Sequence, residues 1–469
     1  MKTRIGCAFA VLGLVLSGAL PGLGADRVWT NAADGQYGEA GNWQSGVLPA
    51  TSDNACFSRS GGGTYAINFD SPSTNPTVQD IYVSGSNDVT LNLAGHSLTA
   101  TRYLQGYAPL TGKLTVNGGN LSFGSTVYMP LSGDLTLVVT NGARLTATNG
   151  TFTLPVGAHA GSLVVAGNST TCEVSYVYMN PSGSGKSSLL LDDGATFISS
   201  AQSDCYISPQ DSATATAIVD HASSWINKHF NMRLGAYANS RGTLIVRGNG
   251  SYLETSQLEV RNGAELHIGA GAGVALAKDQ SHYYLYVNES QPVHTAVVGG
   301  AGKLRLANGA LPSHIYFVDF GGILQPGDDG VGTLTFEDCN VCWARAGARL
   351  EFELGGKAPG QCDRLILTNA VTASSSDKQM RLATGVTIAV TVLRSFRGYA
   401  QVGDTFDLIE TGLFLDGDGG ALVPSNLVLS FNDPAYDGTL SVVTIGSRRA
   451  LRLTLTKVYK FQGTVVNVR

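Results

Sequence analysis

The chain has 469 residues, of which only 14% are charged, with 30 basic and 35 acidic side chains and a net charge of −5. The low charge and slight acidic excess exclude a nucleic-acid-binding protein that works through a basic surface. The chain contains 59 glycines, well above the usual share of about 7%, and is rich in Thr, Ser, Val and Leu, which is typical of turn-rich all-β structure.

Residues 1–25 have the pattern of a secretory signal peptide. Lys2 and Arg4 are basic, Ile5–Leu16 is apolar, and small residues follow up to Ala25, after which we expect cleavage. A retained membrane anchor is the other interpretation, but the apolar segment is short for a membrane span. No later apolar run reaches the roughly 18 residues of a transmembrane helix. We therefore predict an exported protein without a transmembrane segment in its mature chain.

Residues 26–112 follow no clear period and are predicted to be an N-terminal entry segment that caps the repeats behind it. Three of its aromatic residues are Trp29, Trp43 and Phe57. We expect them to cover the open edge of the first repeat, because an exposed strand edge invites uncontrolled pairing. The alternative role for these rings is stacking on a carbohydrate.

Residues 113–336 contain repeats whose copies begin 26, 26, 28 and 27 residues apart. Each copy is an aliphatic run followed by a turn: Leu137–Leu145, Leu163–Gly167, Leu189–Phe197, Ala217–Trp225 and Leu244–Tyr252. A second short strand-like run follows in each period, without any helical pattern. A unit this short cannot bury its apolar side chains alone. We therefore predict a parallel, right-handed β-solenoid in which each strand pairs with its equivalent one coil further on, about 4.8 Å away.

Residues 337–469 carry longer runs in which apolar and polar residues alternate, as in Leu350–Leu354, Val386–Val392 and Leu451–Thr456. Alternation of this kind is typical of strands with one solvated face. We predict a C-terminal antiparallel β domain that caps the other end of the solenoid.

Six cysteines remain after removal of the signal peptide: Cys56, Cys172, Cys205, Cys339, Cys342 and Cys362. An even number in an exported chain allows three disulfides, in any of fifteen pairings. Cys339 and Cys342 have a spacing compatible with zinc or redox chemistry, but no histidine neighbours them. Core-filling or disulfide-bonded cysteines are the favoured interpretation.

The candidate site consists of Asp192, Asp193, Asp220 and His221. These residues occupy equivalent turn positions in two successive copies, so the predicted stacking brings them together, with Arg247 one coil further on. Such a cluster could bind calcium or shift pKa values for acid–base catalysis. Turn formation explains the same residues, because Asp, Asn and Gly provide local backbone hydrogen bonds. We favour turn formation and predict no catalytic residue, no metal and no cofactor.

Several short motifs occur in a fixed order along the chain. They are Val28–Asn31, Gly41–Pro49, Asp53–Phe57, the repeat unit in Met232–Leu253, Gly321–Phe336, Cys362–Leu365 and Gly403–Ile409. In this order they resemble bacterial secreted and surface proteins with autotransporter-type (PEP-CTERM-associated) β-strand repeats. The resemblance covers most of the mature chain. It implies a secreted or surface-displayed β-solenoid of structural or adhesive character, with no catalytic residue.

We therefore predict an exported, non-enzymatic structural or adhesive protein of the bacterial cell surface. Its expected partners are polysaccharides or neighbouring surface proteins, and not nucleic acid. The alternative is a polysaccharide-active enzyme, a lyase or glycoside hydrolase, that uses the region from Asp192 to His221. A cleft lined by several acids and aromatic residues favours the enzyme, whereas a smooth ribbon of Thr, Ser and Asn favours the scaffold.

Overall fold

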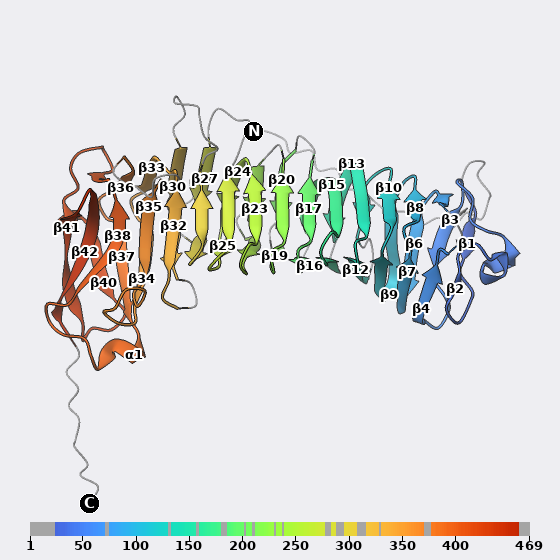
Figure 1. Ribbon diagram of the computed structural model, residues 1–469, viewed down its shortest axis with the longest axis horizontal. Coiled ribbons are helices and arrows are strands. Elements are labelled where there is room, and N and C mark those ends of the chain that lie inside the picture. Colours follow the sequence, from blue (N-terminus) through green and yellow to red (C-terminus); the bar gives the residue numbers. More distant parts are fainter. Residues whose placement is uncertain are drawn as a thin grey trace, which may run out of the picture.

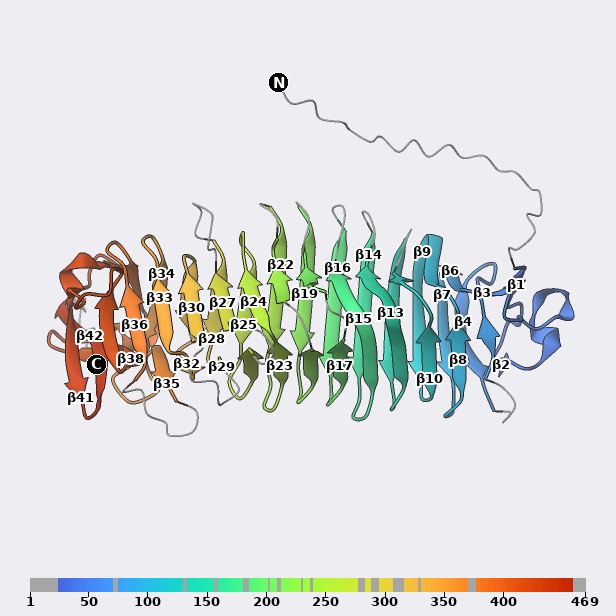
Figure 2. The same cartoon turned by 90° about the horizontal axis from the view of Figure 1, so that it is seen from above.

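The structure is a computed structural model, and it forms an elongated parallel β-solenoid (Figures 1 and 2). The stack begins at β1 (Asp26–Val28) and ends in the antiparallel strands β41 (Asp437–Ile445) and β42 (Arg448–Lys457). The predicted all-β solenoid is thereby confirmed. The described residues are 24–70, 75–129, 133–155, 159–179, 185–200, 203–208, 212–228, 231–236, 239–276, 283–287, 295–306, 316–327, 330–369 and 377–458.

The strands form three faces that run along the solenoid, which we call face 1, face 2 and face 3. Face 1 is one parallel ladder made of β2 (Gly35–Gln36), β4 (Gly63–Asn68), β7 (Asn87–Asn92), the second half of β9 (Leu104–Asn117), β12 (Asp134–Thr140), β14 (Ala160–Ala166), β16 (Lys186–Asp192), β19 (Thr214–Val219), β22 (Arg241–Val246), β25 (Glu265–Ile268), β28 (Val297–Gly300), β31 (Ile323–Pro326), β34 (Arg349–Leu354), β37 (Thr387–Val392) and β40 (Val428–Phe431).

Face 2 is a second parallel ladder, made of β5 (Thr77–Val78), β8 (Ser97–Ala100), β10 (Asn120–Phe123), the first halves of β13 (Arg144–Leu154) and β15 (Thr171–Met179), β17 (Thr196–Ser199), β20 (Ser224–Asn227), β23 (Tyr252–Thr255), β26 (Gly273–Leu276), β29 (Lys303–Arg305), β32 (Thr333–Glu337), β35 (Arg364–Thr368) and β38 (Thr405–Thr411).

Face 3 contains two parallel ladders. The first joins β1, β3 (Asn54–Phe57), β6 (Ile81–Gly85) and the start of β9. The second joins β11 (Val127–Tyr128), the second halves of β13 and β15, β18 (Cys205–Ile207), β21 (Asn231–Leu234), β24 (Gln257–Val260), β27 (Tyr283–Val287), β30 (Tyr316–Phe320), β33 (Val341–Ala344), β36 (Gln379–Leu382) and β39 (Leu413–Asp416).

Helical turns are few and short: η1 (Ala40–Asn42), η2 (Gln44–Gly46), α1 (Arg394–Arg397) and η3 (Pro424–Asn426). Within the described ranges, no helix is long and apolar enough to cross a membrane. Of the predicted signal peptide, only residues 24 and 25 lie within the described part of the chain.

The core is built from inward residues that stack on their equivalents in the next coil. Along face 1, Val139 pairs with Val165, Val165 with Leu191 and Leu191 with Val219, and all four side chains are fully buried. Strand side chains alternate between the two sides of a sheet, so the residues between them face outward. The spacing of one coil therefore places the inward aliphatic residues of β12, β14, β16 and β19 on one another, which explains the sequence period.

Parallel stacking extends beyond the predicted repeat boundaries of 113 and 336 at both ends. The described residues between 26 and 112 form coils of the same solenoid. An asparagine stands at the end of successive strands: the Nδ2 of Asn92 donates to Asn68 Oδ1 (2.7 Å), and Asn117 donates to Asn92 in the same way (2.8 Å). In residues 337–469, β34, β37 and β40 still pair in parallel, and antiparallel pairing joins only β38, β42 and β41 among the described strands. The alternation of apolar and polar residues correctly predicted strands with one solvent-exposed face, but such a pattern does not distinguish parallel from antiparallel partners.

Aromatic rings fill the N-terminal end of the core. Trp29 and Trp43 are 0% and 2% exposed and meet edge to face at 5.2 Å between ring centroids, and Phe57 is also buried. The Nε1 of Trp43 donates to the Tyr37 carbonyl (2.9 Å). Because their faces are enclosed, these rings serve the core of the first coils and offer no open platform to a sugar.

All six described cysteines are free thiols, and five of them are buried. They fill the core, which agrees with one of the two favoured interpretations, and they form no disulfides. Burial raises the pKa of Cys56 to about 12, of Cys205 to about 11 and of Cys339 to about 12, so these thiols stay neutral and poorly nucleophilic.

Asp363 is a fully buried carboxyl group that joins two neighbouring segments. It accepts backbone N–H groups from Gly332 (2.7 Å) and Glu353 (2.6 Å). A Cβ at Gly327 would lie 2.2 Å from Asp363 Oδ1, and Gly327 has a φ of +92°, so both contact and backbone require glycine there. Burial raises the pKa of Asp363 to about 7 despite the two N–H donors.

We expect Asp363 to make the stability of the fold fall as the pH rises from about 4 to about 7. In this range the folded state keeps the proton that the unfolded carboxyl has lost, so the unfolding free energy decreases by up to about 1.4 kcal/mol per pH unit. Asp363→Asn removes this contribution. Urea unfolding midpoints at pH 5 and pH 8 measure it.

Asp416→Asn is the matched control, because Asp416 also accepts two backbone N–H groups, from Asp418 and Gly420, but is partly exposed. The control should keep the pH dependence of the wild type. The same dependence in Asp363→Asn would contradict this role for the buried carboxyl.

Candidate functional site

The four predicted site residues lie at the turns that follow β16 and β19 on face 1. Asp192 ends β16, and Asp193 follows it with a φ of +54°. Asp220 follows β19, and His221 has a φ of +45°. Leu191 pairs with Val219, so the two turns are stacked one coil apart as predicted. Positive φ is uncommon outside glycine and is best tolerated by Asp, Asn and His, which accounts for the residue types at 193 and 221.

Asp220 is the best-enclosed member of the cluster, with its side chain 8% exposed. Its Oδ1 accepts the backbone N–H of His221 (2.8 Å), and its Oδ2 accepts Nε of Arg247 from the next coil (2.7 Å). Burial alone would raise the pKa of Asp220, but the hydrogen bonds from Arg247 and the His221 backbone outweigh it and hold the pKa below its usual value. Asp220 is therefore a fixed anion that bridges two coils.

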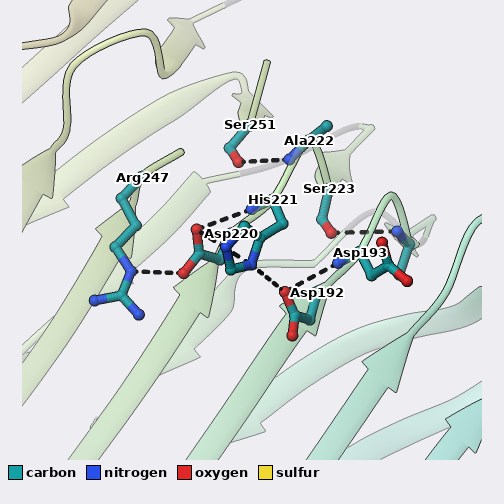
Figure 3. Close-up of polar contacts among 9 residues, drawn as sticks. Asp192, Asp193, Asp220, His221, Ala222, Ser223, Arg247 and Ser251 are labelled. Carbon is teal, nitrogen blue, oxygen red and sulfur yellow. Dashed lines mark hydrogen bonds and ion pairs between the residues drawn. The ribbon is translucent and has the colours of Figure 1, made fainter. Parts of the chain in front are cut away.

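Asp192 and His221 form the exposed part of the cluster (Figure 3). His221 Nδ1 lies 2.6 Å from Asp192 Oδ1, which also accepts the backbone N–H of Asp193 (3.0 Å). The hydrogen bond to Asp192, together with the charges of Asp220 and Asp192, raises the pKa of His221 above its usual value. The His221 side chain is 70% exposed, so this pair is a solvated contact between coils.

Hydroxyl groups of each following coil complete these turns, and sequence analysis did not identify them. Ser223 Oγ accepts the backbone N–H of Ala195 (3.2 Å), and Ser251 Oγ accepts that of Ala222 (3.1 Å). Thr170 does the same for Gly142 (3.0 Å). All three hydroxyl residues are buried. The signal in the sequence is a Ser or Thr four or five residues after the end of the aliphatic strand, as Thr170, Ser223 and Ser251 stand after β14, β19 and β22.

The structure brings together Asp192, Asp220, His221 and Arg247, whereas the Asp193 side chain points away from them (Figure 3). Among the described residues, no group of three or more His, Cys, Asp or Glu side chains is arranged to hold a metal ion. Asp192 and Asp220 each accept a backbone N–H of their own turn, and the contacts of His221 with Asp192 and of Arg247 with Asp220 join one coil to the next.

A shallow hollow of about 370 Å³ lies on face 3 near the N-terminal end, lined by Asp26, Cys56, Ser58, Tyr82 and Ser84. Its thiol belongs to Cys56, which is neutral, and Asp26 accepts a hydrogen bond from Asn54 Nδ2 (2.7 Å). A neutral thiol is a poor nucleophile.

Two buried carboxylates on face 3, Asp80 and Asp319, are each held by an arginine of the next coil. Asp80 accepts both Nη2 of Arg102 (2.5 Å) and the backbone N–H of Tyr103 (3.0 Å). Nε and Nη2 of Arg345 donate to the two carboxylate oxygens of Asp319. Such bidentate pairs fix the relative positions of coils and leave little capacity for a ligand.

No protein-family model matches the chain, and no curated protein is similar to it at a significant level.

We expect Arg247→Ala to destabilise the fold by about 1–3 kcal/mol, because it leaves the enclosed carboxylate of Asp220 without its charged partner. His221→Asn, which tolerates the same positive φ, should leave the unfolding midpoint unchanged, because the His221 side chain is solvated. Urea unfolding at pH 7 followed by circular dichroism measures both. Equal effects of the two variants would contradict the assignment of Asp220 as the member that joins the coils.

Proposed function

We propose that this protein is an exported, non-enzymatic scaffold that projects from or coats a bacterial surface and binds neighbouring proteins or glycans along its repetitive faces. The observation that carries the proposal is the state of the candidate site. Asp220 is neutralised by Arg247, Asp192 caps its own turn, and Asp193 points elsewhere. A site of this kind stabilises coils and has no carboxyl group arranged as a general acid opposite a base.

The surface of face 1 supports the scaffold role. Its outward residues include rows of Thr, Ser and Asn that run from coil to coil, such as Thr136, Ser162, Ser188, Thr216 and Thr243. Rows of hydroxyl residues of this kind are expected of a scaffold. A rigid rod with the same groups every 4.8 Å or so suits many weak contacts in parallel, which gain strength through multivalency.

A polysaccharide-active enzyme is the second candidate, and one observation favours it. His221 is exposed, its pKa is raised, and it contacts a carboxylate at 2.6 Å. These are properties of a general acid or base. The described residues around it are Asp192, Asp220 and Arg247, whose hydrogen bonds within the turns and between the coils compete with any such role.

Binding and turnover on a panel of plant, algal and bacterial polysaccharides separates the two candidates. We expect no new reducing ends or unsaturated products, and any binding should be unchanged in Asp192→Asn/His221→Gln. Products that form with the wild type and disappear in this variant would establish an enzyme. Asp193→Asn, which changes the carboxyl that points away from the cluster, is the matched control.

Export predicts that the mature protein starts at Asp26, because cleavage is expected after Ala25. Expression of the whole gene in a Gram-negative host, followed by intact mass measurement of the periplasmic or secreted fraction, tests this. A chain that keeps Met1 and remains in the cytoplasm would contradict export.

A further inference from the structure

One outward row of face 1 is aliphatic over five successive strands. Its residues pair with one another across β12, β14, β16, β19 and β22, and all are partly exposed: Val138, Val164, Leu190, Ile218 and Ile245. The row begins after Thr115 and ends before His267, which occupy the same row on β9 and β25. Solvated strand faces normally carry polar residues, and contiguous exposed apolar surface marks interaction sites. We call this row the aliphatic ridge.

A row of hydroxyl residues runs beside the aliphatic ridge, two residues earlier in each strand. At its centre, Ser162 and Ser188 stand next to Val164 and Leu190, and their hydroxyl oxygens lie 2.6 Å apart. Serine is much smaller than valine or leucine, so the hydroxyl row is lower than the ridge there. A ridge beside a furrow is self-complementary, because a second copy that is turned round can place its ridge in the furrow.

Charges at the two ends of β16 have opposite signs. Lys186 starts the strand and is exposed, and Asp192 ends it. They are six residues apart, roughly 20 Å along an extended strand.

We propose that this part of face 1 is the contact surface between two copies of the chain, related by a twofold axis parallel to the solenoid. This rotation keeps the order of the coils and reverses the strand direction. The ridge of each copy then lies over the hydroxyl row of the other, and Lys186 lies opposite the partner's Asp192. The same patch is used on both copies, as in most symmetric dimers.

The charges of β22 also meet in this arrangement. Arg241, at the start of β22, faces the partner's Arg247, whose charge is balanced by the partner's Asp220 through an ion pair that measures 2.7 Å in this chain. The two inner rows carry no charge at all over the five strands. Contact between them therefore buries no unpaired ion, which would be costly.

The size of the patch predicts a reversible contact. Five coils of about 4.8 Å and strands of about 20 Å give an area of roughly 500 Å² per copy. Stable interfaces bury about 800 Å² per partner. Association should therefore be weak in dilute solution and strong where copies are crowded side by side. A role for this contact in assembling copies on a surface rests on the scaffold function proposed above, whereas the contact itself does not.

Sedimentation velocity of the purified full-length chain over a wide concentration range tests the proposal without any glycan. We expect a monomer–dimer equilibrium whose dissociation constant rises at least tenfold in Leu190→Lys/Ile218→Lys. Ile198→Lys/Ile226→Lys is the matched control, because these isoleucines are paired, outward and partly exposed on face 2 of the same two coils. It should associate like the wild type. Leu190→Thr/Ile218→Thr, which keeps strand-forming side chains, should also weaken association.

A charge reversal tests the orientation of the two copies. Lys186→Glu should weaken association, and Lys186→Glu/Asp192→Lys should restore it. A chain that stays monomeric at all concentrations, or equal losses in the face 1 and face 2 variants, would overturn the proposal even if glycan binding is found. Polysaccharide turnover would instead refute the scaffold function and leave the self-association result standing.

Discussion

Stacking of each coil on the next is the constraint on which the whole structure depends. A strand such as β16 has parallel partners on both sides, β14 and β19, and its inward side chains pack on theirs. Neither the backbone groups nor the aliphatic side chains of one coil are satisfied without those neighbours. The ends are therefore the weak points, and the chain closes them with buried aromatic rings around Trp29 and with the antiparallel strands β42 and β41.

The same constraint explains the chemistry of the turns. A turn between two strands leaves backbone N–H groups that need acceptors, and in this protein the acceptor often belongs to the next coil. Ser223 Oγ accepts a backbone N–H from the turn one coil before it, and Ser251 Oγ accepts one from the turn that contains Ser223. Asp220 accepts from its own turn and binds Arg247 of the following coil. Polar residues that resemble a catalytic cluster in the sequence thus act as links between coils.

Stacking also aligns the equivalent outward residues of successive coils into rows along the solenoid. Asparagines at strand ends become a ladder of side-chain hydrogen bonds, and the aliphatic ridge arises in the same manner on face 1. On face 3, Tyr178 and Tyr206 stack with their centroids 4.9 Å apart and their planes 8° from parallel. Their ring faces cover each other, so this row is less suited to stacking on sugars than its composition suggests. What the surface of this fold can bind therefore depends on whole rows of side chains and not on single residues.

The period of 26 to 28 residues and the repeated aliphatic run determined the solenoid fold by themselves, because a unit of that length can bury its apolar residues only against another copy. They also determined that Asp192, Asp220 and His221 meet, since equivalent turns must stack. The extent of the solenoid was decided only in three dimensions: Asn68 and β37 belong to parallel ladders although their sequences match the repeat poorly, because backbone pairing needs strand geometry and not a particular side chain. The hydrogen bonds of Asp220 and the outward direction of the Leu190 side chain were also decided only in three dimensions, because both depend on the register between neighbouring strands. A register shift of one residue would turn each of these side chains to the other face of the sheet.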